Sequence, residues 1–298
     1  MPSRKFPRPS VLLSALLMLS GLMVGAATAG ELTRGGKLLL TGGVSALEGG
    51  AGGGLATWAV IAGDETTSGV GGTAHLTSVT LPDFSLRSVG GAVGLFDRVE
   101  LSLARQEFDT GATGGKLGLG RGFTFTQDVA GLKVRLIGDA VYDQDRPLPQ
   151  IAVGAQFKRN DQGAIIRAVG GQDDSGVDYY VAATKILLDR RLLLNATLRA
   201  TKANQTGLLG FGGDRGDRYG AQAEASAGWL LSRRLLVGAE YRSKPSQLGF
   251  AREDDWKDLF AAYAVTRSVS ITAAYVDLGA IATFKAQRGL YLSLQAGF

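Results

Sequence analysis

RGLYLSLQAGF, residues 288–298, alternates apolar and polar side chains with a period of two. One face carries Leu290, Leu292, Leu294, Ala296 and Phe298, and the other carries Tyr291, Ser293, Gln295 and Gly297. This alternation predicts a β-strand with one apolar and one polar side. Its length suits a tilted strand that crosses a bilayer, which needs about 9–11 residues. An antiparallel sheet of a soluble sandwich produces the same pattern, so the rest of the chain must separate the two folds.

The same stretch resembles the closing strand of Gram-negative outer-membrane β-barrels, which characteristically ends in an aromatic residue that the insertion machinery reads. The resemblance implies that Phe298 is an assembly signal. It also implies that the barrel insertion machinery is a partner of this chain.

Five further segments alternate, with every charge except the terminal Lys202 on one face. They are residues 132–142, 150–158, 192–202, 219–230 and 235–242. In a membrane barrel the charged face lines the interior and the apolar face contacts lipid. We therefore expect the following side chains to line a lumen: Lys133, Arg135, Asp139, Gln156, Lys158, Arg199, Gln222, Glu224, Glu240 and Arg242.

Connection lengths favour a membrane barrel over a sandwich. Tight turns are expected at residues 96–98, 189–191, 232–234 and 266–268, and longer loops at residues 202–218, 243–257 and 277–287. Alternation of short and long connections is typical of bacterial outer-membrane barrels, whose short turns face the periplasm. Aromatic residues near strand ends suit interfacial girdles or ordinary strand packing. These residues are Tyr219, Trp229, Tyr241 and Tyr275.

The first half of the chain leaves the strand number open. Counting back from Phe298 gives an up-and-down antiparallel barrel of about fourteen strands that starts near Val70. Two further segments, residues 38–44 and 55–61, would raise the number to sixteen, and merging weak strands would lower it to twelve. The glycine-rich residues 116–126 predict a strand or a lumen insert. Residues 30–68 predict either an N-terminal plug or an extra strand pair before the barrel.

The N-terminus predicts export. A basic start, an apolar run over residues 11–25 and the small residues Ala27 and Ala29 make a secretory signal peptide over residues 1–29. The barrel domain is then residues 30–298, with a net charge of +2 because three of the 32 basic residues and no acid lie in the signal. This balance argues against nucleic acid as a partner. The 44 glycines argue against an all-helical domain.

Several longer runs resemble, in order, a bacterial family known only as domain-of-unknown-function family 3034. They are residues 40–45, 139–145, 198–205, 253–260 and 287–298. The resemblance implies an envelope protein and brings no activity or site residues with it.

Little in the sequence suggests catalysis. The single histidine, His75, lies on a predicted strand beside Thr73 and Thr77 and is expected to form lumen hydrogen bonds rather than act as a base. Acidic pairs in predicted outer loops, such as Asp143 with Asp145, could bind divalent cations that bridge lipopolysaccharide, but solvated loops are the preferred interpretation. We expect no enzymatic activity, no cofactor and no dedicated metal site.

Two functions fit this outer-membrane protein. The first is a passive channel for small solutes, lined by the charged inward face. The second is a non-transport barrel, structural or partner-binding, whose inward charges pair across a filled lumen. Both imply contact with outer-membrane lipid and lipopolysaccharide, and a homo-oligomer is left open.

Overall fold

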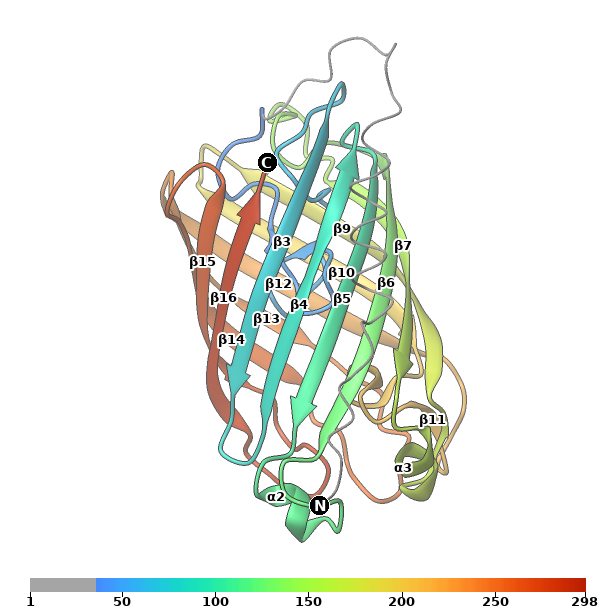
Figure 1. Ribbon diagram of the computed structural model, residues 1–298. Helices are drawn as coiled ribbons and strands as arrows, with labels where there is room; N and C mark the ends of the chain where they lie inside the picture. Colours follow the sequence, from blue (N-terminus) through green and yellow to red (C-terminus); the bar gives the residue numbers. More distant parts are fainter. Residues whose placement is uncertain (1–35) are drawn as a thin grey trace, which may run out of the picture. The chain divides into compact units, whose positions relative to one another are not determined.

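The structure, a computed structural model, describes residues 36–298, so the expected signal peptide lies outside the described residues. Within this range twelve antiparallel strands close into a barrel, and each strand except the first and last pairs with its neighbours in chain order (Figure 1). The strands are β3 (Val70–Thr80), β4 (Ser85–Leu95), β5 (Val99–Asp109), β6 (Thr124–Ile137), β7 (Gln150–Asn160), β9 (Ser175–Leu187), β10 (Leu192–Thr201), β12 (Gly220–Ser232), β13 (Leu235–Arg242), β14 (Trp256–Ala264), β15 (Val269–Asp277) and β16 (Arg288–Gly297).

The closing strand β16 completes the barrel by pairing with β3, from Leu290 opposite Thr80 to Gly297 opposite Thr73. Closure leaves no strand edge unpaired, which a sheet in lipid requires. The alternating stretch that ends the chain is therefore the seam of the barrel.

The predicted number of about fourteen strands is wrong, because the barrel has twelve strands within residues 36–298. Two segments that the sequence count treats separately, residues 116–126 and 132–142, are not separate strands. One continuous strand, β6, runs from Thr124 to Ile137 and takes in the end of the first segment and the start of the second. The residues before it form a loop with the short helix α2 (Thr113–Lys116). The expected strand at residues 132–142 is too long at its end, since Ala140 lies past the end of β6 and is buried.

The exterior of the barrel is apolar. Along β12, Ala221, Ala223, Ala225, Ala227 and Trp229 are exposed, and the intervening residues are buried or half-buried. Leu290, Leu292 and Leu294 of β16 are 46–50% exposed, whereas Tyr291 and Ser293 between them are buried. This inside-out distribution suits a surface surrounded by lipid. None of the helices within residues 36–298 combines the length and apolarity that a membrane span needs.

The two ends of the barrel differ. One end, here called the tight-turn end, carries the turns at residues 96–98, 188–191, 233–234 and 265–268, as the sequence predicted. The other, here called the loop end, carries α2, α3 (Gly163–Ala168), the 3-10 helix η2 (Asn204–Gly207) and a small sheet of β8 (Gly171–Asp173) with β11 (Phe211–Gly213). In Figure 1 the tight-turn end is uppermost.

Two connections break the predicted alternation of lengths. Residues 81–84 form a short link at the loop end, and residues 138–149 form a long one at the tight-turn end. The second places Asp143 and Asp145 at the tight-turn end, so the expectation that they lie in an outer loop is wrong.

The outward face of β12 provides a test of a lipid surround. Ala225, in the middle of the strand, and Ala221, near its loop end, both point outward. Ala225→Arg should lower the free energy of unfolding by about 2–4 kcal/mol, and Ala221→Arg by about 0–1 kcal/mol, because the cost of arginine in lipid falls toward the interface. Denaturant titration in lipid vesicles measures both values. Equal costs at the two depths would contradict a membrane-spanning barrel.

Candidate functional site: a plugged lumen

Residues 41–63, here called the plug, lie inside the barrel (Figure 1). The chain enters from the tight-turn end, forms a small hairpin of β1 (Val44–Ser45) and β2 (Ala51–Gly52), and returns to the same end before β3 begins. Residues 44–63 are all buried. The expected extra pair of barrel strands at residues 38–44 and 55–61 is therefore wrong, because the short hairpin takes no part in the barrel sheet. The described part of residues 30–68 agrees with the other expectation, a plug.

Glycines let the plug backbone approach the barrel wall closely. A Cβ at Gly53 would lie 1.9 Å from Glu240 Oε1, and one at Gly49 would lie 2.9 Å from the carbonyl oxygen of Leu103. Gly49 also has a φ of +94°, which side chains rarely adopt. The glycine-rich run of residues 49–54 is therefore needed for the fit.

Glu48, at the turn of the hairpin, is the centre of a buried charge network. Its carboxylate lies 2.5 Å from Lys158 Nζ, 2.9 Å from Arg242 Nη2 and 3.8 Å from Arg199 Nη2. Two wall carboxylates complete the network, Asp178 at 2.7 Å from Lys158 and Glu224 at 2.6 Å from Arg199. Three acids thus face three bases, and all six side chains are at most 4% exposed.

Two further wall carboxylates bind the plug backbone. Glu240 accepts hydrogen bonds from the Leu55 amide at 2.8 Å and the Ala56 amide at 3.4 Å. Glu100 accepts from the Ala51 amide at 3.2 Å and the Ala62 amide at 2.9 Å. Charged acceptors make stronger hydrogen bonds to buried amides than neutral ones do.

Lys133 binds both the Glu100 carboxylate and two carbonyl oxygens of the plug. Its ammonium lies 3.1 Å from Glu100 and donates to the carbonyl oxygens of Ala51 and Val60 at 3.1 and 3.0 Å. Plug amides and plug carbonyls are thus both bound by wall charges, as buried backbone groups require.

Neutral wall side chains bind the remaining turn of the plug. The Thr57 carbonyl accepts from Asn195 and Thr197, and the Trp58 indole donates to Ser226 Oγ at 2.8 Å. The Ala59 amide donates to Thr184 Oγ1 at 2.7 Å. The wall is therefore complementary to the plug along its whole path.

A second ion cluster holds the base of the plug at the tight-turn end. Lys37 Nζ lies 3.3 Å from Glu65 and 3.1 Å from Asp97, and donates to the Ile61 and Gly63 carbonyls. Burial raises the pKa of the Glu65 carboxyl to about 7, against the opposing effect of the Lys37 ammonium. Glu65 lies outside the strands, between plug and β3.

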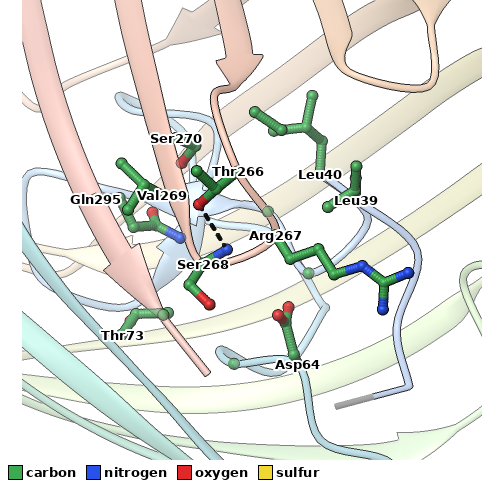
Figure 2. A pocket seen from close by; sticks show the side chains of 15 residues that line it. Leu39, Leu40, Asp64, Thr73, Thr266, Arg267, Ser268, Val269, Ser270 and Gln295 are labelled. Carbon is green, nitrogen blue, oxygen red and sulfur yellow. Dashed lines mark hydrogen bonds between the residues drawn. The ribbon is translucent and has the colours of Figure 1, made fainter.

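The end of β16 contacts the plug where it enters and leaves the barrel. Figure 2 labels Gln295 of this strand and Asp64, which follows the plug. Gln295 accepts a hydrogen bond from the Ser45 amide at 2.5 Å. The Phe298 carbonyl oxygen accepts from the Asp64 amide at 3.1 Å and from the Gly72 amide at 3.0 Å. Phe298 is 47% exposed, and its role as an assembly signal stays a prediction.

The predicted lumen residues divide into two groups. Seven are buried and contact the plug or the charges around it: Lys133, Gln156, Lys158, Arg199, Glu224, Glu240 and Arg242. The other three lie near the barrel ends. Arg135 and Asp139 pair at 3.1 Å at the tight-turn end, and Gln222 accepts from Ser243 near the loop end.

Sequence reasoning did not identify Glu48, Glu100 or Asp178. Glu100 lies within a predicted strand, where alternation with Ser102 and Gln106 could have assigned it to the inward face. Glu48 has no periodic pattern around it. Its one signal is that it is the only acidic residue between Glu31 and Asp64.

Between the plug and the loop end, the lumen is apolar. Phe84 packs against Phe108 and Phe284 with ring centroids 5.1 and 5.6 Å apart. Side chains from the loops, including Leu208 and Ile281, join this cluster around a cavity of about 40 Å³. The interior is therefore filled by charges around the plug and by packed apolar side chains toward the loop end.

His75 lies in the wall with its Nε2 atom 3.2 Å from Ser88 Oγ, and Ser88 donates to the Leu47 carbonyl of the plug. Among the described residues, no carboxylate hydrogen-bonds to His75, and no group of three or more His, Cys, Asp or Glu side chains could hold a metal ion.

Comparisons with known proteins give a family and a fold. The model of the family described as "Protein of unknown function (DUF3034)" matches residues 41–295. The fold is similar to that of the KdgM porin, at 8% identity and a TM-score of 0.51, over 76% of this chain and 99% of that chain. A structure of the NanC porin matches over 76% of this chain and 98% of that chain, at 8% identity and a TM-score of 0.47. No curated protein sequence matches.

Glu48→Gln tests the central network. It leaves three buried cations with two buried carboxylates, and breaking a buried ion pair from one side costs about 3–5 kcal/mol. Denaturant titration in lipid vesicles measures the loss.

The control is Asp217→Asn, which removes a loop ion pair with Lys202 in which Asp217 is 42% exposed. Its expected cost is about 1 kcal/mol or less. A cost for Glu48→Gln as small as that of the control would show that the network does not hold the plug.

Proposed function

As a member of the DUF3034 family the chain inherits no assigned activity, and we propose that it is an outer-membrane transport barrel that its own N-terminal plug closes. The observation that carries the proposal is the occupied lumen. There Glu240 and Glu100 of the wall bind plug amides, and Lys133 binds plug carbonyls. Solutes pass when the plug moves. This differs from a permanently open porin, because residues 44–63 are buried inside the barrel.

The apolar outer belt supports the membrane location, and the porin-like fold is consistent with it. In this orientation the tight-turn end faces the periplasm and the loop end faces outward. The surrounding partners are outer-membrane lipid and lipopolysaccharide. The proposal includes no enzymatic step, no cofactor and no nucleic acid.

A non-transport barrel is the second candidate, and the balanced charges around Glu48 favour it. A network of three acids and three bases needs no solute or ion for neutrality. If the plug never moves, the protein is structural or displays its loops to a partner.

Single-channel recording with a covalent lock separates the two candidates. Ala59 N lies 2.7 Å from Thr184 Oγ1, and the chain contains no cysteine, so cysteines at these two positions can cross-link plug and wall. We expect rare openings in the wild type and about 10-fold more current in Glu48→Gln, because the plug is then held more weakly. Oxidised Ala59→Cys/Thr184→Cys added to Glu48→Gln should abolish the current, and reduction should restore it.

The matched control carries Ala59→Cys alone with Glu48→Gln, and its current should not respond to oxidation. Current that persists in the oxidised double-cysteine protein would place the conducting path outside the plug. Folded protein without current in any variant would instead support the non-transport barrel.

A further inference from the structure

A large cavity opens at the tight-turn end, outside the plugged lumen. Its volume is about 1030 Å³, and it lies between residues 36–41 and the turns that join β9 to β10, β12 to β13 and β14 to β15. Cavities that bind small molecules typically have volumes of about 300–1,000 Å³. None of the wall charges that bind the plug backbone lines this space.

Each of the three turns contributes one arginine to the cavity, namely Arg191, Arg233 and Arg267. All three are exposed. Within residues 36–298 their guanidinium groups have no hydrogen bond or ion pair. Figure 2 shows the Arg267 side chain extending from its turn past Leu39.

Two further charged residues, Lys37 and Asp64, line the cavity. Lys37 in the lining is held by Glu65 and Asp97. Asp64 is the only acidic residue among those that line the cavity. Three arginines against one carboxylate leave a positive site that an anion can neutralise.

The remaining lining is mostly leucine. It comprises Leu38, Leu39, Leu188, Leu230 and Leu231. Leu38 is 46% and Leu231 53% exposed. Apolar surface of this kind gains free energy when a ligand removes it from water.

We propose that this cavity binds an anionic amphiphile, a molecule that joins a phosphate or carboxylate group to an apolar chain. Guanidinium groups bind these planar or tetrahedral anions through paired N–H donors, and the leucines accept the chain. Two sources share this chemistry, an anionic phospholipid of the surrounding leaflet and a free amphiphile in the periplasm. The site goes beyond the transport proposal, because binding here requires no movement of the plug.

The rival explanation is general attraction by a basic rim. Three other exposed arginines lie on tight turns of this end but outside the cavity lining. Arg98 and Arg234 donate to backbone carbonyls, and Arg190 lies 3.7 Å from Asp189. They provide a control of equal charge and similar location.

The test compares two triple variants in a non-ionic detergent. The cavity variant is Arg191→Gln/Arg233→Gln/Arg267→Gln, and the rim variant is Arg98→Gln/Arg190→Gln/Arg234→Gln. Dodecyl phosphate is titrated into each protein by calorimetry, and inorganic phosphate is the probe without a chain. Intact folding of each variant is verified by gel mobility before and after heating.

We expect the cavity variant to bind dodecyl phosphate at least about 10-fold more weakly than the wild type, a loss of about 1.4 kcal/mol, and the rim variant to stay within about twofold. Inorganic phosphate should bind far more weakly than dodecyl phosphate. Equal losses in both variants, no binding to the wild type, or equal affinity for the two probes would overturn the proposal.

A second measurement identifies the source. Native mass spectrometry of protein released from nanodiscs of phosphatidylglycerol and phosphatidylethanolamine reports the retained lipid. Retention of phosphatidylglycerol that the cavity variant loses assigns the site to leaflet lipid. Dodecyl phosphate binding without lipid retention assigns it to a free amphiphile. Both results support the site, and the currents of the plug variants test the transport proposal separately.

Discussion

The fold depends on one buried charge from the plug. Glu48 brings a carboxylate among Lys158, Arg199 and Arg242, which otherwise share only Asp178 and Glu224. Unpaired ions are costly to bury, and without Glu48 the three bases of this cluster would face only two carboxylates. With the plug in place the charges balance. The wall and the plug are therefore complementary parts of a single core.

Because of this complementarity, charged side chains in the lumen do not by themselves indicate an open channel. In an open porin, water solvates the inward charges, and such charges favour the passage of polar solutes. Here the same charges are the hydrogen-bond partners of buried backbone, as Glu240 is for Leu55 and Glu100 for Ala62. A barrel with polar side chains inside can thus be closed without an apolar plug. Under the proposed transport function, access depends on the free energy needed to remove the plug from its ionic partners.

The barrel could be predicted from sequence because its signal is local. Alternation places Lys158, Arg199 and Glu240 inward whatever their partners are, and the structure buries all three. The strand number could not be fixed, since the glycines near residue 120 look alike in a strand and in the loop that precedes Thr124. The plug contacts were beyond sequence reasoning. Glu48 and Arg242 are 194 residues apart. The plug has no periodicity, because its hairpin strands are only two residues long and wall side chains bind much of the remaining backbone.

The barrel seam and the base of the plug share residues. β16 pairs with β3, while Gln295 accepts from Ser45 and the Phe298 carbonyl accepts from both Asp64 and Gly72. Because β3 directly follows the plug, the strand that closes the barrel also contacts both segments by which the plug enters and leaves. Correct closure and correct seating of the plug therefore stabilise each other. Movement of the inner hairpin can leave this base in place, since Glu48 and its partners are separate from the Lys37, Glu65 and Asp97 cluster.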